Sequence, residues 1–158
     1  MKSYDLSELN ILVLEKNVLL RRLLTDVFSE FGVPTVFSTH DAHEAYNYFC
    51  TNAPDIVFCD WTPDLDGMGF VRQIRKADDT PNPYSPIVVV TANTELRHVY
   101  HARDNGMTEF LAKPISANHF KNTRYNLLAG DQRLLSGFEV FDRHVACSQL
   151  IWADDNRQ

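Results

Sequence analysis

Asp60 is the residue of this chain best placed to do chemistry, because it follows the apolar run Ile56–Cys59. Such a run is typical of a strand buried on both faces of a parallel sheet. In these sheets ligands bind beyond the carboxyl ends of the strands, where a carboxylate can act as a nucleophile. A turn or helix-capping role for Asp60 fits its position equally well. The residues at the other strand ends must decide between the two.

Four further polar side chains stand at the ends of apolar runs. They are, in chain order, Glu15, Lys16, Thr91 and Lys113. If the runs are neighbouring parallel strands, these side chains converge with Asp60 on a single pocket. A carboxylate nucleophile, a hydroxyl donor and an ammonium that neutralises an oxyanion are the groups that formation of an aspartyl-phosphate requires. The sequence therefore favours phosphoryl transfer to Asp60.

The elements that must position these groups alternate along the chain. Five apolar runs are separated by stretches long enough for a helix and two turns. The predicted strands are residues 11–14, 33–37, 56–59, 87–90 and 110–112, and the last helix is predicted over 116–128. Parallel strands with right-handed crossovers predict a doubly wound α/β, flavodoxin-like sheet of five strands in the order 2-1-3-4-5, with helices on both faces.

Capping signals support the helices of this scheme. Asn17 and Gly32 are placed to begin and end the first helix, and Gly106 to end the fourth. Asp41 and Glu44 have the spacing of a capping box, in which each side chain bonds the other residue's amide. These predicted helices therefore have residues suited to begin or end them.

Composition limits the class of protein. A chain of 158 residues with 44% hydrophobic residues is long enough for one domain with a sizeable core. A net charge of −6 argues against nucleic-acid binding. The N-terminus has no apolar signal region, no run is long enough to span a membrane, and the three cysteines form no CxxC pair. We therefore expect a cytoplasmic protein with reduced thiols and no membrane or nucleic-acid partner.

Taken together, the motifs resemble the receiver domains of bacterial two-component response regulators. The likeness runs from about Leu9 to Leu128, so we divide the chain into a receiver domain, 1–128, and a C-terminal extension, 129–158. The matching elements are Asp60 with Pro63, Asp66 and Gly67, then the segments 86–92 and 109–114. The extension is too short for an output domain with its own core, which leaves docking on its own domain, dimerisation or partner recognition as its roles.

The resemblance implies a role for each strand-end residue. Asp60 would accept a phosphoryl group from a histidine kinase or phosphotransfer protein, with Thr91 and Lys113 contacting that group. Phe110 matches the aromatic residue that switches together with the threonine. Such a domain is a signalling module rather than an enzyme, and it acts on a downstream protein partner or forms a homodimer through its fourth helix, fifth strand and fifth helix, or here through the extension.

The chain departs from the family at its metal site. Receivers have two acidic residues after the first strand, and the second binds Mg²⁺ together with the phosphoacceptor; here the pair is Glu15 and Lys16. With lysine in place of the second acid, the charges of Glu15, Lys16, Asp60 and Lys113 sum to zero instead of minus two. We therefore expect Mg²⁺ to bind weakly or not at all. The remaining ligands are Glu15, Asp60 and the Thr62 carbonyl, whose position is uncertain because the loop to Pro63 is one residue short.

Two positions are open to Lys16. Its ammonium can enter the pocket and pair with Asp60, which we favour because two carboxylates attract it, or it can extend into solvent. The leading hypothesis is a stand-alone response regulator whose phosphorylation at Asp60 is impaired. The first alternative is a pseudo-receiver that works without phosphorylation. The second is an aspartate-nucleophile phosphohydrolase, although such enzymes carry an acid where this chain has Thr62.

Overall fold

The computed structural model describes residues 7–62, 65–93 and 95–114. Within them, five parallel strands form one sheet in the order β2-β1-β3-β4-β5, as predicted. The strands are β1 (Asn10–Leu14), β2 (Thr35–Thr39), β3 (Ile56–Asp60), β4 (Ile87–Thr91) and β5 (Glu109–Ala112). The helices are α1 (Val18–Glu30), α2 (Ala42–Asn52), α3 (Gly67–Lys76) and α4 (Leu96–Asp104). The helix predicted over 116–128 and the extension 129–158 lie outside the described residues.

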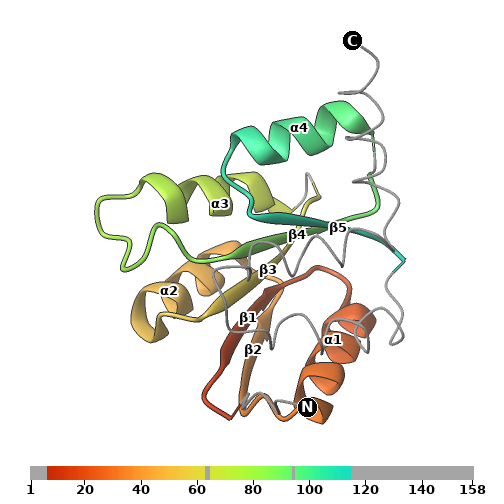
Figure 1. Cartoon of the computed structure of the whole chain (residues 1–158), viewed down its shortest axis with the longest axis vertical. Helices are drawn as coiled ribbons and strands as arrows, with labels where there is room; N and C mark the ends of the chain where they lie inside the picture. The colour runs from red at the N-terminus through yellow and green to blue at the C-terminus, as the bar shows by residue number, and fades with distance from the viewer. Residues whose placement is uncertain (1–6, 63–64, 94, 115–158) are drawn as a thin grey trace, which may run out of the picture.

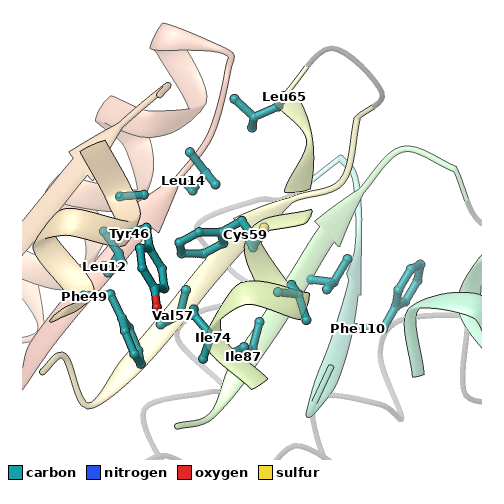
Figure 2. Close-up of a cluster of buried hydrophobic side chains, with 14 of the residues drawn as sticks. Leu12, Leu14, Tyr46, Phe49, Val57, Cys59, Leu65, Ile74, Ile87 and Phe110 are labelled. Carbon is teal, nitrogen blue, oxygen red and sulfur yellow. The ribbon is translucent and has the colours of Figure 1, made fainter. Parts of the chain in front are cut away.

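Helices cover both faces of the sheet (Figure 1). Residues of α1 pack on alternate strand residues such as Ile11, Val13 and Phe58, whereas α2, α3 and α4 pack on the residues between them. Figure 2 shows this second cluster, in which Phe49 and Ile74 lie against the middle of the sheet. Since successive strand residues face opposite ways, the central strands must be apolar throughout. Every residue of β3 and β4 is buried.

The second strand begins two residues later than the sequence predicts. Val33 donates its amide to the Phe28 carbonyl at 3.1 Å, and Gly32, with φ +85°, donates to Ser29 at 3.0 Å. These two bonds make a Schellman motif, in which the residue after the glycine packs back on the helix. Val33 is buried with Phe28 for this reason, and its assignment to the strand was wrong. The fifth strand begins at residue 109, one residue before the predicted start.

The helix caps agree with the sequence except for one half of the capping box. The Asn17 side chain accepts the amides of Leu19 and Leu20 at 2.9 and 3.0 Å and begins α1 as predicted. Asp41 caps α2 by accepting the Glu44 amide at 2.9 Å. The Glu44 carboxylate, however, accepts the Thr39 hydroxyl, and that hydroxyl accepts the Asp41 amide at 3.1 Å. A residue at the end of β2 thus replaces the reciprocal bond of the capping box.

None of the helices in the described part of the chain is long and apolar enough to cross a membrane. The polar edge of the sheet lies at the carboxyl ends of the strands, where Glu15, Asp60 and Thr91 are buried although each is polar. Burying a carboxylate is costly unless a partner compensates it. The candidate site is therefore at this edge.

Candidate functional site at the carboxyl edge of the sheet

Asp60 is the last residue of β3 and is 1% exposed. It continues the alternation of Ile56 and Phe58, whose side chains pack on the α1 face of the sheet. Its strand is central, paired with β1 on one side and β4 on the other. The sequence prediction that Asp60 ends a fully buried strand is confirmed.

Glu15 follows β1 directly and lies beside Asp60, because the two strands are hydrogen-bonded neighbours. Its amide donates to the Thr39 carbonyl at 3.0 Å, which extends the pairing with β2 by one residue. Its carboxylate is 1% exposed, and Oε1 accepts the Asn17 amide at 2.8 Å. The backbone at the start of α1 therefore holds Glu15 with its side chain turned into the edge of the sheet.

Lys113 joins the two carboxylates. Its amide donates to the Thr91 carbonyl at 2.8 Å, so the residue continues β5 alongside β4. Its Nζ lies 2.9 Å from Asp60 Oδ1, 3.0 Å from Glu15 Oε2 and 3.3 Å from Glu15 Oε1. One ammonium thus neutralises one of two buried negative charges, and the three groups keep one net negative charge.

The pKa shifts follow from this burial and pairing. Burial raises the pKa of Glu15 above its usual value, and this outweighs the bonds from Asn17 and Lys113, which lower it. Burial lowers the pKa of Lys113, but its bonds to Asp60 and Glu15 outweigh burial, so that the pKa is raised. The ammonium is therefore held in its charged form by the carboxylates that it bridges.

Thr91 ends β4 on the face of the sheet that α4 covers, opposite to the α1 face on which Asp60 lies. The hydroxyl donates to the Trp61 carbonyl at 3.3 Å and accepts the Asn93 amide at 3.0 Å. It lines a groove of about 440 Å³ between the β3–α3 loop and α4, together with Trp61, Met68 and the imidazole of His101. The His101 ring meets the Trp61 ring edge-on at 6.2 Å between centroids. The sequence predicted that Thr91 shares one pocket with Asp60, but here its hydroxyl bonds the Trp61 carbonyl and the Asn93 amide and lines a separate groove.

Phe110 is 7% exposed and belongs to the cluster under α2, α3 and α4. It lies at one end of this cluster in Figure 2. Val99 of α4 is a member of the same cluster, and the partly buried Met107 packs against it. The aromatic residue that the sequence matched to the switch position is therefore packed inward, in the layer that also carries α4.

Lys16 is exposed, and the ammonium against Asp60 is that of Lys113. The preferred prediction, that Lys16 pairs with Asp60 inside the pocket, does not describe this structure. The Lys113 ammonium already bridges the two carboxylates, and the β1–α1 turn that carries Lys16 is bonded by Arg21, whose Nη1 donates to the carbonyls of Glu15 and Lys16 at 2.8 and 3.3 Å. Sequence reasoning missed Arg21, since a bond to backbone carbonyls leaves no pattern of residue types.

The donor set fits a divalent ion only in part. Glu15 Oε2 is buried, and its contact with Lys113 does not have the geometry of a hydrogen bond, so this oxygen has lone pairs left for a cation. The Thr62 carbonyl already accepts the Leu65 amide at 3.1 Å, which leaves it one lone pair. No cluster of three His, Cys, Asp or Glu side chains suited to a metal occurs among residues 7–62, 65–93 and 95–114. Two carboxylates and a carbonyl suit a largely hydrated Mg²⁺.

Comparison with known proteins identifies the architecture around this site. Residues 11–124 match the family model of the response regulator receiver domain. The sensor histidine kinases RcsC of Salmonella typhi and Escherichia coli are 32% and 30% identical to the chain over 117 and 120 residues. These stretches are 73% and 75% of the chain but 12% of each kinase, so the chain spans only a small part of these relatives.

Solved structures agree on the fold. NtrX from Brucella abortus, solved with ADP, is similar with a TM-score of 0.62 and 26% identity over 75% of this chain and 26% of that one. CheY4 of Vibrio cholerae has a TM-score of 0.66 and 21% identity, covering 76% of this chain and 98% of its own. The receiver domain of the kinase PA1611 from Pseudomonas aeruginosa, solved with a magnesium ion in its active-site cleft, has a TM-score of 0.64 and 23% identity over 77% and 98% of the two chains. The chain belongs to the response regulator receiver domain family of two-component signalling systems.

Proposed function

We propose that this receiver accepts a phosphoryl group on Asp60 and signals by protein contact. The observation that carries the proposal is the bridge of Lys113 Nζ to Asp60 Oδ1 at 2.9 Å, within a buried edge where Glu15 supplies a second carboxylate. An ammonium in this position neutralises the charge that develops on a transferring phosphoryl group. A purely structural ion pair would not need the second carboxylate.

In the proposed step an Asp60 oxygen attacks the phosphorus of a phosphohistidine on a histidine kinase or phosphotransfer protein. A bond from this oxygen to phosphorus forms as the bond from phosphorus to the imidazole nitrogen breaks, and the nitrogen takes its electron pair and then a proton. Lys113 shifts from the carboxylate toward the new phosphoryl oxygens, to which it is already close. Positioning and charge account for the rate in such transfers.

A magnesium ion would be held by Glu15, Asp60 and the Thr62 carbonyl, with water in the remaining positions, and would supply positive charge to the phosphoryl oxygens. We propose that it binds weakly, because an exposed lysine stands where the family has a third acid. The receiver domain of PA1611, which was solved with a magnesium ion, supports a metal at this cleft by its common fold.

The output is proposed to pass through Thr91. Its hydroxyl must leave the Trp61 carbonyl to bond a phosphoryl group, which would release the 3.0 Å bond from the Asn93 amide and alter the turn before α4. Phe110 packs in the same layer as α4 and would move with it. A downstream protein, or a second copy of the chain, would then bind the surface of α4 and β5 or the extension 129–158. The stand-alone arrangement and the cytoplasmic location stay predictions of the sequence.

The test is incubation with a small phosphodonor such as acetyl phosphate and Mg²⁺, followed by intact-mass measurement. We expect one added phosphoryl group, which hydroxylamine removes as it does an acyl phosphate. Asp60→Asn should remove the adduct, whereas Asp104→Asn, an exposed aspartate of α4, should retain it. An adduct that persists in Asp60→Asn would contradict the proposal.

The pseudo-receiver is the second candidate, and the observation in its favour is Lys16 in place of an acid. It predicts no adduct in the wild-type chain but one in Lys16→Asp, which restores the acidic pair. The phosphohydrolase alternative predicts turnover of phosphate esters that Asp60→Asn abolishes. We propose that no such turnover occurs, since Thr62 stands where these enzymes have their second acid.

A further inference from the structure

Arg21 lies on the first turns of α1, but its guanidinium turns back across the start of the helix. Its Nη1 donates to the Glu15 carbonyl at 2.8 Å and to the Lys16 carbonyl at 3.3 Å. Its own amide donates to the Asn17 carbonyl at 2.9 Å. One side chain therefore binds the carbonyls of the two consecutive residues that link β1 to α1.

These bonds restrain the backbone on both sides of Lys16. Each peptide unit is planar, so a residue has only the two dihedral angles that relate the planes on either side of its Cα. The Glu15 carbonyl belongs to the plane before Lys16, and the Lys16 carbonyl belongs to the plane after it. Holding both carbonyls fixes the two dihedral angles of Lys16 and with them the direction of its Cβ. In the structure this direction leaves Lys16 exposed.

The pocket beside Lys16 would otherwise attract its ammonium. Glu15, Asp60 and Lys113 keep one net negative charge at an edge that is nearly closed to water. Two unit charges about 4 Å apart attract by about 4 kcal/mol at an effective dielectric of about 20. An ammonium that entered would cancel the remaining charge and occupy the space that a phosphoryl group or a metal ion needs.

We propose that Arg21 is a positioning residue for phosphoryl transfer, because its clamp on the β1–α1 turn keeps Lys16 out of the carboxylate pocket. This inference rests on the proposed function, in that the benefit of an open pocket is the reactivity of Asp60. It explains how a chain with lysine at this position retains a usable phosphoacceptor. The same guanidinium thus bonds the carbonyl of Glu15, whose side chain is buried, and that of Lys16, whose side chain is exposed.

The first experiment measures the position of Lys16 without phosphorylation. A short pulse of acetic anhydride acetylates accessible amines, and peptide mass spectrometry gives the rate at Lys16 relative to exposed Lys76. In Arg21→Met we expect this ratio to fall roughly tenfold, the change that about 1.4 kcal/mol of ion pairing with the pocket produces. Arg22→Met removes the same charge from the neighbouring, exposed position of α1 and should leave the ratio unchanged.

The second experiment measures phosphorylation by acetyl phosphate. Arg21→Met should slow formation of the Asp60 adduct, and adding Lys16→Ala to the same chain should restore the rate. A purely structural role for Arg21 would not be rescued by shortening a different side chain. Arg21→Lys, which keeps one donor group, should lie between wild type and Arg21→Met in both experiments, and it carries the test if thermal melting shows Arg21→Met to be unfolded.

The outcomes separate the two proposals. An unchanged acetylation ratio in the folded Arg21 variants, or a slow rate that Lys16→Ala does not restore, would overturn the clamp. Absence of any adduct in wild type would count against the proposed function, while the acetylation ratio would still decide whether Arg21 holds Lys16 outside.

Discussion

Two partly buried cations hold opposite edges of the same sheet, and they differ in what they bind. Lys113, at the carboxyl edge, contacts the carboxylates of Asp60 and Glu15. Arg75 of α3 lies near the opposite ends of β4 and β5, where it donates to the Gly106 carbonyl at 2.8 Å and the Pro83 carbonyl at 2.7 Å. Its third bond, at 3.4 Å, goes to the Thr108 hydroxyl, which also accepts the Ile87 amide. These three acceptors are neutral.

The two cations respond to burial in opposite ways. The pKa of Lys113 is raised because its anionic partners outweigh the effect of burial. The pKa of Arg75 is lowered, because burial disfavours its charge. A cation that faces anions is coupled to any change in their charge, such as phosphorylation. A cation that faces carbonyls is not, and it serves to join three segments of chain.

The largest effect is expected where the cation faces anions. Lys113→Met removes the group that neutralises the transferring phosphoryl, and loss of one such donor costs about a hundredfold in rate. The rate of adduct formation from acetyl phosphate measures this effect. Lys76→Met, which removes an exposed lysine of α3, should leave the rate unchanged. A nearly normal rate in Lys113→Met would show that the bridge to Asp60 is structural.

At the other edge the expected loss is of stability and not of reactivity. Arg75→Met leaves the partly buried carbonyls of Gly106 and Pro83 without this donor, and unpaired polar groups cost about 2 kcal/mol in unfolding free energy. Urea unfolding measures it, and the loss should be similar at low and high salt because no ion pair is broken. Arg103→Met is the control, since this exposed arginine pairs with the adjacent Asp104 and lies over the Tyr100 ring, both of them weak surface contacts. A lower rate of phosphorylation in Arg75→Met would contradict the view that Arg75 contributes to stability alone, whereas Lys113 contributes to reactivity.

The packing around Arg75 gives a smaller and sharper test. Gly106 has φ +100°, and a Cβ added there would lie 2.8 Å from Arg75 Cγ; Gly32 has φ +85° with nothing within 4 Å of an added Cβ. Both alanine variants carry backbone strain, but only the new methyl group of Gly106→Ala also clashes with a side chain. Gly106→Ala should therefore lower the free energy of unfolding by about 1 kcal/mol more than Gly32→Ala does. Adding Arg75→Ala should remove this extra cost. Equal losses of unfolding free energy in the two alanine variants would show that the Arg75 side chain moves aside without a loss of stability.

The sequence predicted the strand order, because it follows from where apolar runs end in a parallel sheet. Of the five side chains predicted to share one pocket, Glu15, Asp60 and Lys113 meet, whereas Lys16 is exposed and the Thr91 hydroxyl bonds the Trp61 carbonyl. The sequence misplaced the start of β2, because Val33 was counted as the first apolar residue of the strand. Its side chain instead packs against the end of α1. The capping box was also predicted only in part, because the Glu44 carboxylate bonds the Thr39 hydroxyl instead of the Asp41 amide.

Bonds from arginine side chains to backbone carbonyls were beyond sequence reasoning. Arg21 and Arg75 both bind carbonyls, which every residue has, so nothing in the pattern of side chains marks them. The exposed Lys16 follows Glu15 in the turn whose carbonyls Arg21 bonds. Charge attraction alone predicted that Lys16 would enter the pocket, because it took no account of the Lys113 ammonium, which already bridges the two carboxylates.

The smallest effect concerns how Glu15 itself titrates. Burial raises its pKa above the ordinary value of 4.5, so the folded chain binds a proton at this site more tightly than the unfolded chain does. Protonation therefore favours folding, and the contribution present below pH 4.5 is lost as pH rises through the folded pKa. Glu15→Gln does not titrate, so the unfolding free energy of wild type minus that of this variant should decrease with pH across this range.

Urea unfolding at a series of pH values measures the difference, and Glu30→Gln, an exposed glutamate at the end of α1, provides the control. A difference that stays constant or grows with pH would mean that Lys113 and the Asn17 amide compensate the buried carboxylate fully. The carboxyl edge would then resemble the Arg75 edge, where the cation binds neutral acceptors and no carboxylate titrates with it. A decrease would identify Glu15 as a carboxylate kept at a cost in stability, as expected of a group retained for the chemistry at Asp60.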